Sequence, residues 1–171
     1  MGFLKDSEVI DRINKGELIL KGASKSALTP NGYDLSIDKA SIDLYEPIVL
    51  GNMEGRIVFT KEYLKLNTKQ TAMLFLRSSY SRLGGWGSFG FVDAGFEGVL
   101  QFVVYLPSAV WKVLREKEDT RMVQIVFYEY DSNVAQGYAQ RSGNYQGLTI
   151  DKLKKEVGNT SFSVLDLGDF K

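Results

Sequence analysis

Short apolar segments alternate with turns along most of this chain, and the apolar segments are rich in β-branched and aromatic residues. Such segments are typical of strands, and the glycine, proline and asparagine residues between them are typical of tight turns. Strands are predicted at 18–20, 35–44, 56–60, 71–76, 99–105 and 121–130. Many short strands with regular breaks favour a mainly β fold of the sandwich or barrel-like type, in one domain spanning 1–171.

A short helix is predicted at each end of this pattern. Near the N-terminus, Ser7 is expected to cap a helix that Gly16 ends, with Val9 and Ile13 on one face. A second helix is predicted over 149–157, where charged and apolar residues alternate at helical spacing.

The composition excludes several kinds of chemistry. The chain has no cysteine and no histidine, which removes disulfides, thiolate nucleophiles, histidine bases and imidazole metal ligands. Lys and Arg number 21, as do Asp and Glu, so no net charge attracts nucleic acid or an acidic membrane. The absence of a long apolar run and of an apolar leader predicts a soluble, cytoplasmic protein. Carboxylate chemistry remains, with oxygen ligands for a hard ion such as Mg²⁺.

The segment Arg77-Ser78-Ser79 ends an apolar strand and is followed by Arg82. Guanidinium groups and small hydroxyls suit phosphate oxygens, so this segment is a candidate phosphate site. The same residues also fit a structural role, in which Arg77 pairs with an acid and the serines make turn hydrogen bonds.

Asp93 lies within an apolar segment between Phe91 and Phe96. A carboxylate in such a place must be solvated, paired or functional, and a positioned carboxylate can act as a general base. The glycines between the two segments predict a hairpin that brings Asp93 near Arg77, so that a phosphorylated substrate is held beside an activated water. The alternative is a turn aspartate that caps Gly95.

Three further features are weaker candidates. Asp34 follows an Asn-Gly turn at the start of a strand and could hold a metal ion through water. Gln124 is a polar residue within an apolar strand, so it needs a partner if buried, and a phosphate is one candidate. The polar segment 132–148 is either a surface loop or a flexible lid that carries Arg141 and Tyr145 over a bound ligand.

Taken in order, these segments resemble the motifs of the dUTPase and dCTP deaminase family, from about residue 28 to residue 148. The matching segments are Gly32-Tyr33-Asp34-Leu35, Arg77-Ser78-Ser79 with Arg82, the run from Gly90 to Gly98, Arg121-Met122-Val123-Gln124-Ile125, and Tyr145-Gln146-Gly147. The resemblance implies a distorted β-barrel of the β-clip or jelly-roll type, in a homotrimer whose sites are shared between subunits. It also implies a pyrimidine deoxynucleoside triphosphate as substrate and Mg²⁺ as cofactor.

The resemblance also implies a role for each matching residue. Asp93 is expected to be the general base that aligns water against the α-phosphorus, and Asp34 to order Mg²⁺ through water. The implied substrate-binding residues are Arg77, Ser78, Ser79, Arg82, Gly90, Phe91, Phe96, Gln124, Tyr138, Arg141, Tyr145 and Gln146. Phe96 is expected against the deoxyribose, and the backbone of 88–91 against the pyrimidine edge. The lid residues Tyr138, Arg141 and Tyr145 are expected over the triphosphate.

The chain departs from the deaminase pattern at Val103. Val103 is the tenth residue after Asp93, the motif aspartate. Deaminases of the family place a proton-shuttling glutamate at this position, and a valine cannot transfer a proton. The interpretation is a Mg²⁺-dependent dUTP diphosphatase that gives dUMP and pyrophosphate. One alternative is a dCTP deaminase, alone or bifunctional, in which another acid such as Glu97 does this work. The other is a non-catalytic nucleotide-binding trimer, because Asn144 and Leu148 depart from the usual lid motif.

Overall fold

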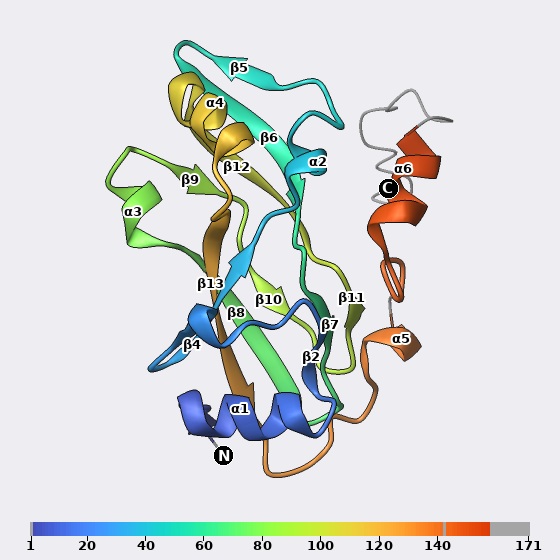
Figure 1. The fold of residues 1–171 in the computed structure, drawn as a ribbon. Helices are drawn as coiled ribbons and strands as arrows, with labels where there is room; N and C mark the ends of the chain where they lie inside the picture. The colour runs from blue at the N-terminus through green and yellow to red at the C-terminus, as the bar shows by residue number, and fades with distance from the viewer. Residues whose placement is uncertain (1, 142, 158–171) are drawn as a thin grey trace.

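The computed structural model describes residues 2–141 and 143–157, and antiparallel β-sheets form its body (Figure 1). The strands of the largest sheet are β1 (Gly2–Phe3), β3 (Leu28–Thr29), β4 (Gly32–Ser36), β8 (Gln70–Leu76), β10 (Phe91–Val92) and β13 (Arg121–Glu129). Their order is β10-β8-β13-β4-β3, and β1 also pairs with β13. Strand β13 is therefore central, with β8 on one side and β4 on the other.

Two smaller sheets complete the body. One has the order β5-β6-β12-β9 and consists of β5 (Ile48–Leu50), β6 (Met53–Phe59), β9 (Trp86–Gly87) and β12 (Gln101–Pro107). The other has the order β11-β7-β2 and consists of β2 (Leu18–Lys21), β7 (Tyr63–Lys65) and β11 (Glu97–Gly98). The mainly β fold predicted from the sequence is confirmed.

Short helices lie around the sheets. They are α1 (Asp6–Asn14), the 3₁₀ turn η1 (Lys25–Ala27), α2 (Lys39–Ile42), α3 (Ser78–Ser81), α4 (Ser108–Glu116), α5 (Tyr138–Arg141) and α6 (Ile150–Val157). Figure 1 shows α5 and α6 on the side of the molecule that carries β11, and α3 on the opposite side. Within the described residues, no helix has both the length and the apolar character needed to cross a membrane.

The alternation along the long strands builds one main core. On β13, Val123, Ile125 and Phe127 are completely buried, whereas the residues between them are partly exposed. On β12, Val104 and Leu106 are also completely buried. Successive side chains of a strand point to opposite faces, so each of these sheets presents one apolar face to the interior.

Most predicted elements are confirmed, and the exceptions have local causes. The prediction of a strand over 35–44 is wrong in its second half, because Asp38 caps α2 with its side chain, which accepts the Ala40 N–H at 2.8 Å. The first helix begins at Asp6, so Ser7 is not its cap. The Glu8 carboxylate instead accepts the Lys5 N–H at 3.0 Å. The second predicted helix is confirmed as α6, one residue shorter at its start.

Helix α4 was not predicted. Trp111 and Leu114, at helical spacing after Pro107, point inward and are buried, and the Trp111 Nε1–H donates to the Glu54 carbonyl oxygen at 2.8 Å. Only this spacing could have indicated a helix, because the β-branched residues around it favour a strand.

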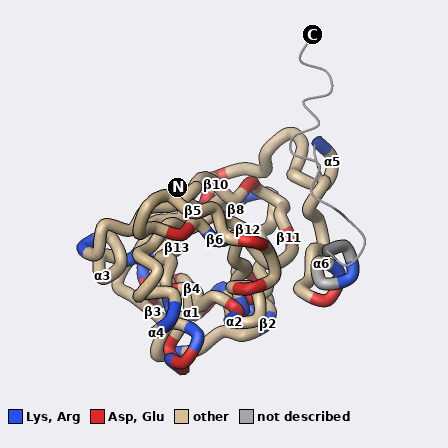
Figure 2. Tube along the Cα trace, turned by 90° about the horizontal axis from the view of Figure 1, so that it is seen from above, with Lys and Arg blue, Asp and Glu red and all other residues tan. Residues whose placement is uncertain are grey.

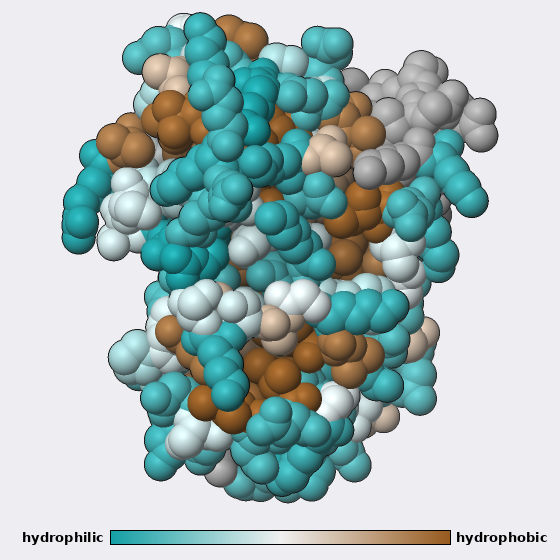
Figure 3. All heavy atoms as spheres, viewed as in Figure 1, coloured by the Kyte–Doolittle hydropathy of each residue, from teal (hydrophilic) through white to brown (hydrophobic). Residues whose placement is uncertain are grey.

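The surface carries mixed charges and scattered apolar side chains. Figure 2 shows Lys and Arg interspersed with Asp and Glu along the chain, in agreement with the zero net charge. Figure 3 shows apolar patches that interrupt the hydrophilic surface. The most exposed large apolar residues include Phe3, Val49, Val113 and Phe91, the last at 71%.

Candidate active site

One part of the candidate site is a polar cluster at the end of β8. Arg77, which directly follows β8, places its Nε 2.8 Å from Asp34 Oδ2 on β4. Its Nη1 donates to the Arg121 carbonyl oxygen at 2.9 Å. Gln124 pairs with Asp34 in the ladder between β13 and β4, and its Nε2 donates to Thr29 Oγ1 at 2.9 Å. The structure thus brings together residues from the first, second and fourth matching segments.

Asp34 acts inside this cluster as the partner of Arg77. Its residue exposure is 7%, and burial raises the pKa of its carboxyl, while the charges of Arg77 and Arg121 act in the opposite direction. The structural alternative for Arg77, a pair with a nearby acid, is therefore observed. The contacts with Asp34 and with the Arg121 carbonyl oxygen leave other N–H groups of the Arg77 guanidinium free to bind a ligand. This structural role is therefore compatible with phosphate binding.

The predicted phosphate-binding hydroxyls lie beside this cluster. Ser78 and Ser79 begin α3 and are both exposed, and Arg82, at the end of α3, is exposed as well. Arg77 and Ser79 also line a groove of about 520 Å³ between α3 and α4. This end of the sheet therefore presents guanidinium and hydroxyl groups at an accessible surface.

The other part of the candidate site surrounds Asp93. Asp93 follows β10 and is exposed. It lines a cavity of about 500 Å³ together with Phe91, Tyr138 and Arg141, and with Tyr130, which the sequence did not single out. The cavity thus combines a carboxylate with a guanidinium, which suits phosphate oxygens, and with aromatic rings, which can stack on a flat ligand.

The turn around Asp93 is held by backbone contacts. The Gly95 N–H donates to the Asn67 carbonyl oxygen at 3.1 Å, so the alternative in which the Asp93 side chain caps Gly95 is wrong. The Phe96 N–H donates to the Asp93 carbonyl oxygen at 3.1 Å. Gly95 has a φ of 84°, which glycine adopts readily, and an added Cβ would lie 3.3 Å from the Tyr138 nitrogen.

Asp93 and Arg77 lie at opposite ends of β8. Val92 pairs with Ala72 near the start of β8, whereas Arg77 follows its last residue. At about 3.3 Å per strand residue, the two backbones are about 20 Å apart. The prediction that a hairpin brings them together is therefore wrong within one chain. Strand β9 pairs with β12 instead, and β10 then runs antiparallel to β8, away from Arg77.

The segments predicted to read the base and the sugar differ in accessibility. The Gly90 carbonyl oxygen accepts the Leu74 N–H at 3.2 Å, and Phe91 is exposed in the Asp93 cavity. Phe96, by contrast, is 6% exposed and packs its ring against Tyr138, with 5.4 Å between the ring centroids. A contact between Phe96 and a deoxyribose stays a prediction, and it requires Tyr138 to move.

The predicted lid is folded against the same chain. Arg141 and Tyr138 of α5 line the Asp93 cavity, and the Tyr138 Oη accepts the Tyr145 N–H at 3.2 Å. Tyr145 itself is 56% exposed. The Gln146 side chain bonds the backbone of the Asp93 turn: its Nε2 donates to the Gly95 carbonyl oxygen and its Oε1 accepts the Glu97 N–H, both at 3.1 Å.

Among residues 2–141 and 143–157, no Mg²⁺ site made of protein ligands is formed. Asp34 already faces Arg77, and the described residues contain no group of three acidic side chains that could hold a metal ion. A divalent ion needs several oxygen ligands, and Mg²⁺ in nucleotide sites usually takes them from phosphates and water. The predicted water-mediated role of Asp34 toward Mg²⁺ stays a prediction, and in this structure its carboxylate is held by Arg77.

Val103 lies on β12, beside the segment that connects β9 to β10. Its N–H donates to Ser88 Oγ at 3.1 Å, and the Ser88 N–H donates to its carbonyl oxygen at 2.9 Å. Ile57 on β6 pairs directly with Val103, and neither of these two side chains carries an ionisable group. Glu97, the possible replacement acid, lies on β11, where Tyr63 Oη donates to it at 3.1 Å.

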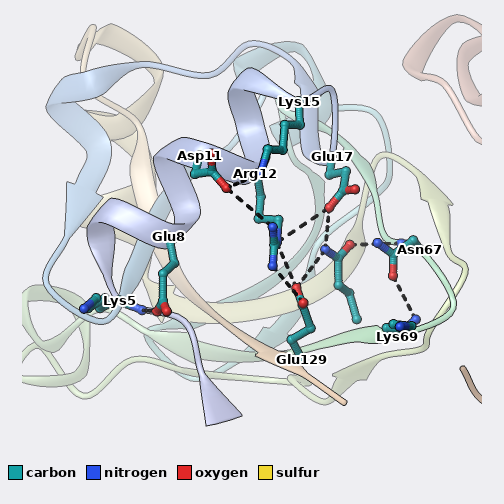
Figure 4. Close-up of polar contacts among 10 residues, drawn as sticks. Lys5, Glu8, Asp11, Arg12, Lys15, Glu17, Asn67, Lys69 and Glu129 are labelled. Atoms are coloured by element: carbon teal, nitrogen blue, oxygen red, sulfur yellow. Dashed lines mark hydrogen bonds and ion pairs between the residues drawn. The ribbon is translucent and has the colours of Figure 1, made fainter. Parts of the chain in front are cut away.

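A polar network behind the Asp93 turn was not predicted (Figure 4). Gln70 is completely buried, its Oε1 accepts the Asn67 N–H at 3.0 Å, and its Nε2 donates to Glu17 Oε2 at 2.7 Å. Arg12 of α1 forms a two-pronged pair with Glu129 at 2.9 and 2.8 Å. A glutamine at the start of an apolar strand is the only sequence signal for this network.

Comparison with known proteins identifies relatives over most of the chain. The chain is 34% identical to the dCTP deaminase of Pyrococcus abyssi over 139 residues, which cover 77% of this chain and 87% of that protein. It is 33% identical to the dCTP deaminase of Pyrococcus horikoshii over 150 residues, covering 81% and 93%. A protein named probable deoxyuridine 5'-triphosphate nucleotidohydrolase, from Sulfolobus islandicus rod-shaped virus 1, is 27% identical over 157 residues, covering 87% and 98%. No protein-family model matches the chain.

Among solved structures, a 2'-deoxycytidine 5'-triphosphate deaminase from Agrobacterium tumefaciens has the same fold. The TM-score is 0.54 at 17% identity, and the match covers 74% of this chain but 46% of that one, so this chain spans about half the length of the solved protein. The identities of 33% and 34%, the order of the matching segments and the β fold together show that the chain belongs to the dUTPase and dCTP deaminase family.

Proposed function

We propose that the protein is a dUTP diphosphatase, an enzyme that hydrolyses dUTP to dUMP and pyrophosphate. The observation that carries this choice is Val103 on β12, where the proton-shuttling glutamate of a deaminase is expected. Deamination needs a group that moves a proton at the base, and neither Val103 nor its strand partner Ile57 can do so. Hydrolysis at the α-phosphorus needs a base for water and positive groups for the phosphates, and the chain has both.

In this proposal the Asp93 carboxylate takes a proton from the attacking water. The oxygen of that water forms a bond to the α-phosphorus, and the bond from this phosphorus to the bridging oxygen breaks as pyrophosphate leaves. Arg77 with the exposed hydroxyls of Ser78 and Ser79 offsets the charge that develops on the phosphate oxygens. Arg141, which shares the Asp93 cavity, supplies a second guanidinium. Mg²⁺ would reach the site bound to the triphosphate.

The proposal includes a homotrimer with sites shared between subunits. The separation of about 20 Å between Asp93 and Arg77 along β8 supports this assembly, because a triphosphate is too short to contact both in one chain. Asp93 of one subunit would therefore act with Arg77 of a neighbouring subunit. The exposed apolar residues on the largest sheet, Phe3, Phe75 and Phe91, are further support for a contact between subunits.

A dCTP deaminase is the second candidate, and the names of the relatives favour it. The relatives at 33% and 34% identity are named dCTP deaminase, whereas the one named as a dUTP-hydrolysing protein is 27% identical. This candidate requires an acid that replaces the missing glutamate. Glu97 is the acid that the matching segments offer besides Asp34 and Asp93, but its carboxylate faces Tyr63 Oη and Lys65 Nζ on β7.

One assay separates the two candidates. The purified protein is incubated with dUTP and with dCTP in separate reactions, and pyrophosphate, ammonia and the base of each product are measured. The dUTPase proposal expects dUMP and pyrophosphate from dUTP, with no uracil nucleotide and no ammonia from dCTP. Uracil nucleotides from dCTP would support the deaminase instead. Tight binding of dUTP with no product from either nucleotide would support the non-catalytic alternative.

A further inference from the structure

The turn that carries Asp93 is held from two sides, by parts of the chain that are distant in the sequence. On one side it is held by the body of the molecule, where Asn67 accepts the Gly95 N–H and the Leu66 N–H donates to the Phe96 carbonyl oxygen at 2.9 Å. Asn67 is in turn fixed by the buried Gln70 (Figure 4). This side therefore belongs to a network anchored on β8 and α1.

The other side of the turn is held by the tail, the described part of 132–148. The Tyr138 N–H donates to the Ala94 carbonyl oxygen at 2.8 Å, and one side chain adds two further bonds. The Gln146 amide donates to the Gly95 carbonyl oxygen and accepts the Glu97 N–H, both at 3.1 Å. The next residue continues the pairing, since the Gly147 N–H donates to the Glu97 carbonyl oxygen at 2.7 Å. Leu148 then forms a parallel bridge with Gly98. Residues 146–148 therefore pair with residues 95–98 along the edge of the turn, much as a neighbouring strand would. At Gln146 the side-chain amide makes the bonds that the backbone of a strand would make.

From this geometry we infer that Gln146 is a positioning residue for Asp93, which acts on the reaction through the turn. The inference rests on the proposed function, in which Asp93 is the base. One N–H and the oxygen of the Gln146 amide bond the turn on either side of Phe96, which fixes this side chain against the turn backbone. The tail therefore acts on the reaction by fixing the turn, and its folding is coupled to the placement of the carboxylate.

The residue type at 146 fits this role closely. A glutamine supplies both a donor and an acceptor from the same planar group, as the Gly95 carbonyl and the Glu97 N–H require. An ionised glutamate keeps the acceptor but sets a negative oxygen against the Gly95 carbonyl oxygen. A protonated glutamate recovers the donor. The effect of Gln146→Glu should therefore depend on pH, whereas a simple loss of packing should not.

The test compares Gln146→Glu and Gln146→Ala with the control Gln140→Glu. Gln140 lies in the same tail, is exposed, and accepts the Gly137 N–H through Oε1 at 3.0 Å, so a glutamate there keeps the observed bond and adds the same charge. Two properties are measured. The first is hydrogen exchange of the Glu97 and Gly147 amides without nucleotide, and the second is kcat and KM for dUTP across pH.

The expected result is about tenfold faster exchange at Glu97 in Gln146→Ala, the loss that one hydrogen bond predicts, with no change in Gln140→Glu. For both Gln146 variants, kcat should fall more than KM rises. For Gln146→Glu, kcat relative to the Gln140→Glu control should recover as the pH is lowered. This recovery separates positioning from a general loss of structure.

Three outcomes would overturn the inference. Unchanged exchange at Glu97 and Gly147 would show that Gln146 does not hold the turn. Faster exchange with unchanged kcat would show that the turn needs no such support for the reaction. A rise in KM at unchanged kcat would assign Gln146 to substrate binding. If the unmodified protein turns over neither dUTP nor dCTP, the proposed function fails, while the exchange measurement still decides whether Gln146 holds the turn.

Discussion

The separation of Asp93 from Arg77 leads to a quantitative prediction about mixed assemblies. Asp93→Asn removes the base, and Arg77→Gln removes the guanidinium charge while leaving an amide that can donate to Asp34. Each change should lower kcat by about 10²-fold or more when every subunit carries it. Gln is chosen over Ala at position 77 because the Asp34 carboxylate is buried and would otherwise lose its partner.

The two variants should restore each other when their subunits are mixed. In the proposed trimer, a site is complete when its Asp93 comes from an Arg77→Gln chain and its Arg77 from an Asp93→Asn chain. At equal amounts and random assembly, each of these choices has a chance of one half, so about one quarter of the sites are complete. The mixture should therefore reach about one quarter of the activity of the unmodified protein, far above either variant alone.

The assay uses subunits that are mixed in denaturant and refolded together, with the pyrophosphate release rate as readout. Each variant and the unmodified protein are refolded alone as controls, and sedimentation checks that all preparations assemble equally. A mixture no more active than the mean of its two components would refute a shared site. It would mean that Asp93 and Arg77 of one chain act together, or that one of them has no part in the reaction.

Three further predictions follow from single residues. In Asp93→Asn, kcat for dUTP should fall about 10²–10⁴-fold with assembly unchanged, and near-normal turnover would remove Asp93 from its role. Val103→Glu should give the protein measurable release of ammonia from dCTP, because the glutamate supplies the missing proton shuttle; no ammonia in a correctly folded variant would show that more than this residue is missing. Burial raises the pKa of Glu62 to about 7 from 4.5, so its contribution to stability is full below about pH 4.5 and is lost as the pH rises through about 7. The free energy of unfolding, measured with urea, should therefore fall as the pH rises from about 4.5 to about 7. The fall should be larger in the unmodified protein than in Glu62→Gln, by up to about 3 kcal/mol. Equal falls in the two proteins would contradict this reasoning.

The strands could be predicted because their signal is local. Apolar, β-branched and aromatic residues are concentrated along 121–130 and 71–76, and this is why β13 and β8 agree with the prediction. Helix α4 could not be predicted in the same way, because its buried Trp111 and Leu114 stand among β-branched residues that favour a strand. There the packing of Trp111 outweighs the local preference.

The members of the candidate site could be selected from the sequence, but their arrangement could not. Residue types and motif order identified Asp34, Arg77 and Gln124, which the structure brings together. The placement of Asp93 depends on which strand β9 pairs with, and this is a long-range choice that no local pattern specifies. For the same reason, the bonds of Gln146 to the Asp93 turn became visible only in three dimensions.

The most direct test of the central claim is the product analysis with dUTP and dCTP. The account predicts that dUTP yields dUMP and pyrophosphate, and that dCTP yields no uracil nucleotide and no ammonia, because Val103 cannot transfer a proton at the base. Conversion of dCTP to dUTP or dUMP by the unmodified protein would contradict it, and would require an acid other than the one expected at position 103.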